Sequence, residues 1–378
     1  MSSALAHLQH ALIRIATVSP RVIASPPTQP RRASVALILR IRPAVEDEAW
    51  LASKWRAGEG NDEDAHLFPT LSTHGANAGM SVEARLRQFF SLPWVQRGTP
   101  ELLYIKRAAR DQDKWSSHVA FPGGRRDEED ENGLYTAMRE TWEEVGIDLA
   151  ERDFLHVGHL EDREITSSLG KRLLMILSPY VFVQLSPFSP MPTLQSAEAS
   201  ALYWVPLTQI YTPTPHWGTI MVDVARHAPR SSTIQWLLRL LIGKMEFRCI
   251  ELPNKPLALV DQAAGTDAEL GVGGQRLLDE EEQEHLAQTT PHLQLWGLTL
   301  GMTLDFVAHM STYEARRGVR ATELSLVQRL LEYAPSTLLL GKPGALAAQR
   351  PAPSMTEVFP RFNYPDVNLY VRRLLAPC

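Results

Sequence analysis

The sequence is poor in cysteine, has no long apolar run and lacks basic stretches interleaved with aromatic residues. Of its 378 residues only Cys249 and Cys378 are cysteines, which excludes a disulfide framework and favours a reducing compartment. No run of 18 apolar residues occurs, so we expect no membrane-spanning helix. The net charge is −5 at pH 7, and this charge without a basic, aromatic-rich stretch indicates no nucleic-acid partner.

The length exceeds that of one average domain. At 378 residues the chain is more than twice the ~150 residues of a typical domain, which predicts one enlarged domain or a domain with an appendage. Hydrophobic residues make up 44% of the chain, enough for a sizeable core. Cys249 lies in an apolar, strand-like stretch, so we interpret it as a core residue rather than a nucleophile.

The most informative segment is residues 123–147, which read GGRRDEEDENGLYTAMRETWEEVGI. A glycine turn leads through an acidic loop into a predicted amphipathic helix. At about 100° per residue, Glu140, Glu143 and Glu144 share one face of this helix. The opposite face suits packing against a core and consists of Leu134, Ala137, Met138, Thr141 and Val145.

Three carboxylates within one turn repel one another and destabilise a helix. Hard divalent cations such as Mg²⁺ and Mn²⁺ prefer oxygen ligands and bridge to phosphate oxygens, so they suit such a cluster. The alternative is a solvated acidic face with an Arg139–Glu143 ion pair. The Phe-Pro-Gly-Gly turn before the helix and Gly146-Ile147 after it favour the metal site. The pattern therefore predicts a metal-dependent phosphoanhydride hydrolase.

This segment resembles the Nudix box, G-x5-E-x7-R-E-U-x-E-E-x-G-U, in which U is a bulky apolar residue. The second half of the box is matched by Arg139, Glu140, Glu143, Glu144, Gly146 and Ile147, with Thr141 as a weak substitute at the first U. Glu131 keeps the seven-residue gap to Arg139, but six residues instead of five separate it from Gly124. The expanded spacing resembles the coenzyme A diphosphatase branch, F-P-G-G-x5-D-x8-R-E, in which Asp130 takes the acidic position.

Four further segments resemble that branch. They are LLYIKRAAR at 102–110, QSAEASALYWVPL at 195–207, FRCIELP at 247–253 and LWGLTLGMTLDFV at 295–307. The second of them places Glu198 at the family's conserved acidic position. The chain departs from the branch before the glycine turn, where Trp115, Ser117 and His118 replace residues that border the substrate. These departures bear on the substrate and leave the box intact.

The resemblance implies roles for individual residues. Glu140, Glu143 and Glu144 would be the ligands of Mg²⁺ or Mn²⁺, and Arg139 would orient a glutamate through an ion pair. Glu144, Glu143 and Glu198 are the candidates for the general base. The substrate phosphates would be bound by the backbone of the glycine turn and by flanking basic residues, namely Gly123, Gly124, Arg107, Arg125 and His118. For the basic residues, ordinary surface charge or packing is the alternative.

The implied reaction is hydrolysis of a diphosphate bond in a small-molecule nucleoside diphosphate derivative. Coenzyme A or acyl-coenzyme A would give 3′,5′-ADP and 4′-phosphopantetheine or its acyl form. NADH, ADP-ribose or another nucleoside diphosphate derivative is the alternative substrate, favoured by Trp115, Ser117 and His118. A third alternative is a non-catalytic Nudix-fold binding protein, against which the complete glutamate set argues. The oligomeric state is left open, with a homodimer as one option.

The expected fold is a Nudix-type α/β/α sandwich with a mixed sheet, which carries two long insertions and a helical C-terminal tail. A Nudix domain would span residues 1–310, with its core at about 1–42, 100–207 and 245–310, insertions at about 43–99 and at 208–244 and 254–290, and an extension at 311–378. Strands are predicted at 34–41, 101–107, 154–160 and 172–184, and helices at 82–94, 134–145 and 232–243, with further helical periodicity in the tail. The acidic run at 279–285 is expected to be a solvated loop rather than a metal site.

The first 45 residues contain six arginines and no acidic residue, a composition that resembles a mitochondrial transit peptide. The competing interpretation is an N-terminal helix followed by the first strand of the fold. Only about residues 1–30 are removable without loss of that strand. We therefore expect a cytoplasmic protein, with mitochondrial import as the alternative.

Overall fold

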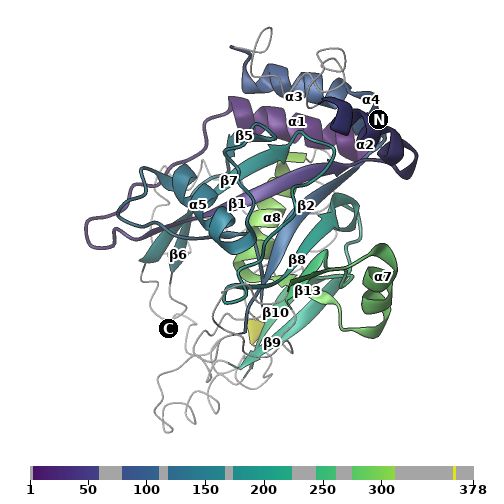
Figure 1. Ribbon diagram of the computed structural model, residues 1–378. Coiled ribbons are helices and arrows are strands. Elements are labelled where there is room, and N and C mark those ends of the chain that lie inside the picture. Colours follow the sequence, from purple (N-terminus) through teal and green to yellow (C-terminus); the bar gives the residue numbers. More distant parts are fainter. Residues whose placement is uncertain are drawn as a thin grey trace, which may run out of the picture.

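The computed structural model describes residues 3–58, 79–109, 118–166, 173–223, 244–260, 275–310 and 361–362. These residues form a large mixed sheet with helices on both of its faces, and a smaller antiparallel sheet beside it (Figure 1). The expected α/β/α architecture with a mixed sheet is therefore confirmed. Among the described residues, no helix is long and apolar enough to cross a membrane.

The large sheet has the strand order β12-β11-β8-β2-β1-β7-β5, and in addition β3 pairs with β2, β4 with β1 and β6 with β7. Its strands are β1 (Arg32–Arg42), β2 (Thr99–Arg107), β3 (Val119–Ala120), β4 (Gly123–Arg125), β5 (Phe154–His159), β6 (Arg163–Thr166), β7 (Leu173–Gln184), β8 (Ala199–Pro206), β11 (Ala258–Val260) and β12 (Gln275–Leu277). Strand β1 is central because it pairs in parallel with β7 and antiparallel with β2. The four strands expected from the sequence are present, each within two residues of its predicted bounds.

Strand β1 explains how one sheet supports two cores. Its residues alternate between the two faces, as the two-residue period of a strand requires. Ala36 and Ile38 pack on the side of helix α5 (Gly133–Val145), and Leu37 and Leu39 pack in the larger core on the other side. Burial on both faces produces the nearly continuous apolar run of this strand.

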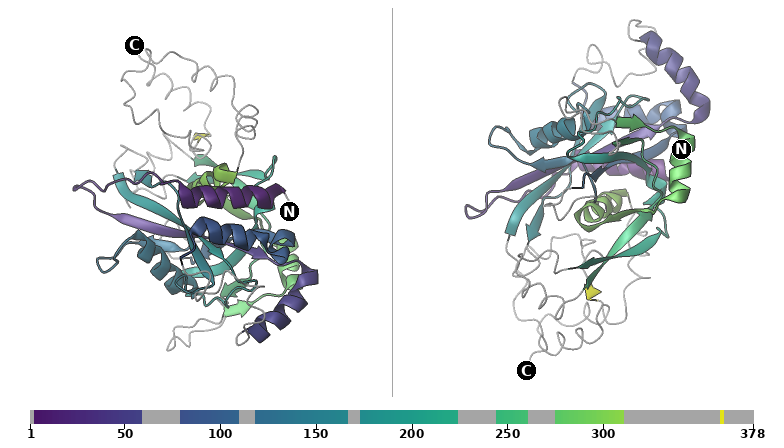
Figure 2. Two further views of the ribbon diagram at one scale, coloured as in Figure 1. Left: turned by 90° about the horizontal axis from the view of Figure 1, so that it is seen from above. Right: turned by 60° about the horizontal axis from the view of Figure 1, so that its bottom comes forward.

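Helices cover both faces of the sheet. α5 lies on one face, and α1 (Ser3–Thr17), α3 (Val82–Ser91) and α8 (Gly297–Met310) contribute to the core on the other (Figures 1 and 2). Helix α1 places Leu5, Leu8 and Leu12 fully inside this core. The N-terminal segment is thus a helix, as one of the two interpretations of its sequence requires.

The segment predicted as the first insertion contributes to the core as well. It holds α2 (Val45–Gly58), α3 and α4 (Pro93–Arg97), and the predicted helix at 82–94 corresponds to the last two. Ser81 caps α3 by accepting a hydrogen bond from the Ala84 amide. Phe89, Phe90 and Trp94 are buried and meet edge to face. This part of the segment is therefore integral to the packing of the domain.

The smaller sheet consists of β9 (Trp217–Asp223), β10 (Lys244–Leu252), β13 (Leu293–Trp296) and β14 (Arg361–Phe362). A short 3-10 helix, η2 (Leu207–Gln209), follows β8. Cys249 in β10 is buried, and burial, the largest cause, raises the pKa of its thiol to about 11. Such a thiol is a poor nucleophile.

The sequence predicts a loop for the acidic run at 279–285, and this prediction is wrong: the run forms the start of helix α7 (Glu280–Thr289). Asp279 and Glu282 form a capping box, in which each side chain accepts a hydrogen bond from the other residue's backbone amide. Carboxylates in the first turn also interact favourably with the helix dipole. The predicted helix at 232–243 and the predicted tail helices lie outside the described residues.

Candidate active site

A glycine turn joins β3 to β4 and lies directly on the central strand. The Ala36 amide donates a hydrogen bond of 2.9 Å to the carbonyl of Pro122. Gly123 has a φ of +146°, and a Cβ there would overlap the Ser34 carbonyl. A Cβ on Gly124 would overlap the carboxylate of Glu140. Gly123 therefore requires glycine, because of its φ and of the β1 backbone beside it, whereas a side chain at Gly124 would displace the carboxylate of Glu140.

Helix α5 begins and ends where its capping residues predict. The Asn132 side chain accepts a hydrogen bond of 2.9 Å from the Tyr135 amide at the N-terminus. Gly146 adopts the left-handed conformation, with a φ of +68°, at the C-terminus. Ala137, Thr141 and Val145 are buried, so the opposite side of the helix faces the glycine turn.

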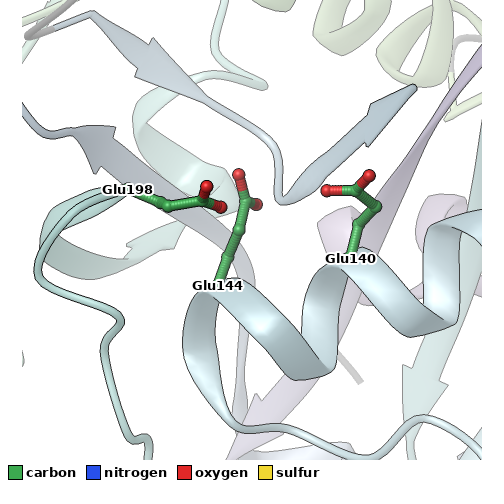
Figure 3. A group of neighbouring side chains, drawn as sticks. All are labelled: Glu140, Glu144 and Glu198. Atoms are coloured by element: carbon green, nitrogen blue, oxygen red, sulfur yellow. The ribbon is translucent and has the colours of Figure 1, made fainter. Parts of the chain in front are cut away.

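Three carboxylates gather beside this turn. Glu140 and Glu144 extend from α5, and Glu198 extends from the loop that precedes β8 (Figure 3). One oxygen from each lies within 4.8 Å of the others. An all-oxygen set of this kind fits a hard divalent cation such as Mg²⁺ or Mn²⁺.

Glu144 is buried next to two other carboxylates. The residue is 4% exposed, and its carboxylate accepts a hydrogen bond of 2.8 Å from the Gly123 amide. Burial, and then repulsion from Glu140 and Glu198, raise the pKa of Glu144 to about 8, against the opposing effect of the Gly123 hydrogen bond. Burial also raises the pKa of Glu140. A cation would relieve both effects.

Arg139 is held by a residue that was not among the predicted site residues. Buried Asp130 accepts two hydrogen bonds from the Arg139 guanidinium, both 2.9 Å long. Arg139, the largest cause, holds the pKa of Asp130 far below its ordinary value. The same guanidinium contacts Glu140 at 3.2 Å and Glu143 at 2.9 Å. Asp130 therefore fixes Arg139, and Arg139 orients the glutamates.

The ion pair of Arg139 distinguishes the two possible spacings of the motif, in which either Glu131 or Asp130 takes the acidic position before the helix. Glu131 is exposed, and its backbone carbonyl accepts a hydrogen bond from Arg126. The buried partner of Arg139 is Asp130, the acidic residue of the expanded spacing. The spacing could have identified it, because only in that alignment does the motif run without a gap.

Glu143 lies apart from the other predicted ligands. Its side chain is 51% exposed and pairs with Arg139, as the solvated-face alternative expected. The described cluster consists of Glu140, Glu144 and Glu198. The structure thus brings together two of the three predicted ligands, Glu140 and Glu144, with Glu198, and both Glu144 and Glu198 are candidate bases.

The predicted phosphate-binding residues differ in their contacts and in their exposure. The Arg107 guanidinium acts on the carboxylate of Glu144, where it opposes the dominant effect of burial on the pKa. The His118 ring meets Trp296 edge to face at 4.7 Å, so it packs as well as bordering the turn. The Arg125 side chain is exposed, and its carbonyl accepts a hydrogen bond from Arg139. Trp115 and Ser117 lie outside the described residues.

Several known proteins are similar to parts of this chain. Residues 87–222 match the family described as NUDIX domain. An uncharacterized protein of Schizosaccharomyces pombe is 35% identical over 197 residues, which cover 50% of this chain and 59% of that protein. The peroxisomal coenzyme A diphosphatase ndx-8 of Caenorhabditis elegans is 34% identical over 28% of this chain and 41% of its own length. The mitochondrial coenzyme A diphosphatase NUDT8 of Mus musculus is 43% identical over 14% and 25%, respectively.

This chain therefore matches less than two thirds of the length of each of these relatives. Among solved structures, the NUDIX domain of Shewanella oneidensis NrtR complexed with ADP ribose is 13% identical, with coverage of 53% of this chain and 87% of that chain and a TM-score of 0.26. The sequence match coincides with the glycine turn, α5 and the loop that carries Glu198. Residues 87–222 thus match the NUDIX domain family, and parts of the chain are similar to proteins named coenzyme A diphosphatases.

Proposed function

We propose that this protein is a metal-dependent hydrolase that cleaves the diphosphate bond of coenzyme A or acyl-coenzyme A. The observation that supports this proposal best is the convergence of Glu140, Glu144 and Glu198 beside the glycine turn. The products would be 3′,5′-ADP and 4′-phosphopantetheine or its acyl form. Mg²⁺ or Mn²⁺ would be held by these three carboxylates, with exposed Glu143 as a further ligand.

The arrangement suits phosphoanhydride hydrolysis. A diphosphate resists attack because its oxygens are negatively charged, and a bound divalent cation supplies charge neutralisation and a more acidic water. The protein contributes the carboxylates that hold the cation and the backbone of Gly123 and Gly124, which a phosphate can approach without a Cβ in the way. Glu143, Glu144 and Glu198 are the candidates for accepting the proton of the attacking water. Arg107 would neutralise charge on the substrate phosphates.

Coenzyme A is the first substrate to test because two similar proteins are named coenzyme A diphosphatases. NADH or ADP-ribose is the second choice, since Trp115, Ser117 and His118 depart from the pattern of that branch. We propose the cytoplasm as the location. Import followed by cleavage near residue 30 would remove α1 and its leucines from the core. A homodimer remains a prediction that light scattering would test.

The decisive experiment is a product assay by chromatography with mass detection. The purified full-length protein would meet coenzyme A, acetyl-coenzyme A, NADH and ADP-ribose, each with Mg²⁺ or Mn²⁺. Glu144→Gln should abolish turnover, and Glu151→Gln, which alters an exposed glutamate away from the cluster, should not.

Each outcome of that assay has a definite meaning. Phosphopantetheine and 3′,5′-ADP from the unmutated protein would support the coenzyme A assignment. Cleavage of NADH or ADP-ribose alone would keep the hydrolase and overturn that substrate. No cleavage by a folded, metal-supplied protein would favour the non-catalytic alternative.

A further inference from the structure

The loop that carries Glu198 runs from residue 185 to residue 198, between β7 and β8, without regular structure. It contains Pro187, Pro190 and Pro192, which have no amide hydrogen to donate. The loop therefore cannot hold its own shape through a regular ladder of hydrogen bonds. The Glu198 backbone is held at its own position, where its carbonyl accepts a hydrogen bond of 2.8 Å from the Ala108 amide and its amide donates one of 2.8 Å to the carbonyl of Gln195. The preceding part of the loop, up to Gln195, is held by anchors outside the loop.

One anchor is the C-terminal end of helix α5. The Thr193 amide donates a hydrogen bond of 2.8 Å to the carbonyl of Val145, and the Gln195 amide donates one of 3.0 Å to the carbonyl of Glu144. These carbonyls belong to the last turn, where a helix has no partners of its own. A Cβ on Gly146 would lie 2.8 Å from the Cβ of Thr193, so glycine permits this close approach.

The second anchor is the side-chain amide of Gln275. Its Oε1 accepts a hydrogen bond of 2.8 Å from the Leu194 amide, and its Nε2 donates one of 2.7 Å to the carbonyl of Pro192. One side chain thus bonds the loop on both sides of Thr193, whose own amide faces α5. The loop is clamped between the helix and this glutamine.

Gln275 is itself fixed to the sheet that carries Glu198. It is the first residue of β12 and pairs with Val260 of β11. Strand β11 pairs with β8, and β8 begins immediately after Glu198. Gln275 therefore links the middle of the loop to β8, the strand that follows the loop, through β12 and β11. Loss of the two Gln275 hydrogen bonds would release one side of the loop and weaken its hold on α5, while β8 stays in place.

We propose that Gln275 is a positioning residue for the candidate metal site, which it serves by holding the Glu198 loop against α5. The inference rests on the proposed function, because it assumes that Glu198 contributes to cation binding. It also gives a role to the predicted insertion at 254–290, which lies outside the segments that resemble the coenzyme A diphosphatase branch.

The test compares three full-length variants in Mn²⁺ titrations monitored by thermal unfolding. Gln275→Met keeps the length of the side chain and removes both hydrogen bonds. Gln275→Glu keeps the acceptor for Leu194 and removes the donor for Pro192. Arg276→Gln is the matched control, because Arg276 lies in the same strand and pairs with exposed Glu282. We expect Gln275→Met to raise the half-saturating Mn²⁺ concentration about tenfold, a typical effect of a residue behind a metal ligand. Gln275→Glu should have a smaller effect, and Arg276→Gln should have none.

A double-mutant cycle separates positioning from general destabilisation. If Gln275 acts through Glu198, Gln275→Met should have almost no further effect on Mn²⁺ affinity in the Glu198→Gln background. An equal loss of affinity in both backgrounds, or no loss in either, would overturn the inference.

Hydrogen exchange of the metal-free protein keeps this inference distinct from the proposed function. Gln275→Met should accelerate exchange of the amides at 193–195 by tenfold or more and leave those of β2 unchanged. Unchanged exchange at 193–195 would overturn the clamp even in an active enzyme. Accelerated exchange in a protein that neither binds Mn²⁺ nor cleaves a diphosphate would confirm the clamp and refute the proposed function.

Discussion

Replacing Glu144 with glutamine should stabilise the metal-free protein at neutral pH. Burial, the largest cause, raises the pKa of this carboxyl from 4.5 to about 8. The folded protein thus keeps Glu144 protonated at pH 7, whereas the unfolded chain would release the proton. This difference costs on the order of 3 kcal/mol of folding free energy. Glutamine is neutral in both states, and its carbonyl can still accept the hydrogen bond from Gly123.

The sign of the pH dependence follows from the raised pKa. Below about pH 4.5 the group is neutral in the folded and the unfolded state and contributes nothing. From pH 4.5 to about 8 the metal-free protein loses stability as the pH rises, because the unfolded chain binds fewer protons than the folded one. Above about pH 8 the penalty is complete and constant. The advantage of Glu144→Gln should therefore increase over this window.

Urea denaturation in the presence of EDTA measures this advantage directly. The unmutated protein, Glu144→Gln and the control Glu151→Gln would be compared at pH 5, 7 and 8. In Mn²⁺ the unmutated protein should be more stable than Glu144→Gln, because the ion binds the ionised carboxylate more strongly than the neutral amide. Equal stability of Glu144→Gln and the unmutated protein at pH 8 in EDTA would refute the assignment of Glu144 to a desolvated, anionic cluster.

Three further substitutions, the second with a matched control, test the glycine turn, the core and the Arg139 ion pair. Gly124→Ala should lower Mn²⁺ affinity in titrations and turnover in the product assay, because the new Cβ displaces the carboxylate of Glu140; unchanged affinity would exclude close packing of the turn on that glutamate. Leu8→Ala should cost about 2–5 kcal/mol in urea denaturation, because its side chain is fully buried in the core under α1. Leu174→Ala, at a position that is 40% exposed, should cost less than about 1 kcal/mol. Asp130→Asn should lower stability by about 3 kcal/mol, since it leaves Arg139 without its buried anionic partner.

Elements whose bounds are set by neighbouring residues in the sequence could be predicted accurately. The apolar face of the helix and Gly146 after it predict the C-terminus of α5 at Val145 and its N-terminus to within one residue. Periodicity alone assigned Glu143 to the same face as Glu140 and Glu144. A helical wheel states only directions, and the ion pair with Arg139 holds the flexible Glu143 side chain toward solvent.

Long-range relationships were harder to predict from the sequence. Glu198 lies 54 positions beyond Glu144 (198 − 144), and no periodicity links the two; only the family resemblance pointed to it. The charge of the run at 279–285 predicts a loop, whereas the capping box of Asp279 and Glu282 stabilises helix α7 there. The clamp by Gln275 joins residues more than 80 positions apart in sequence. Nothing in the local sequence around Gln275 distinguishes this glutamine from a solvated one.

The pairing of Arg139 with Asp130 explains how an arginine can lie beside the cluster without replacing its metal. An unpaired guanidinium within reach of Glu140 would neutralise that carboxylate and compete with a divalent cation. Asp130 accepts two hydrogen bonds from Arg139 and Glu143 accepts another, so most of the arginine's charge is already compensated. Arg139 can then orient Glu140 while the cluster keeps its demand for a cation, which the raised pKa of Glu144 reflects.

Asp130→Asn should have a second effect, beyond the loss of stability. A freed Arg139 should form a stronger ion pair with Glu140, and Mn²⁺ affinity should then fall even at temperatures where the variant is fully folded. Isothermal titration calorimetry with Mn²⁺ at low temperature would measure the affinity, and circular dichroism would confirm the folded state. Arg139→Lys is the useful comparison, because a lysine cannot form the two parallel hydrogen bonds to Asp130. If Asp130→Asn lowers stability and leaves Mn²⁺ affinity unchanged, Asp130 serves the fold alone, and Arg139 does not control the charge of the cluster.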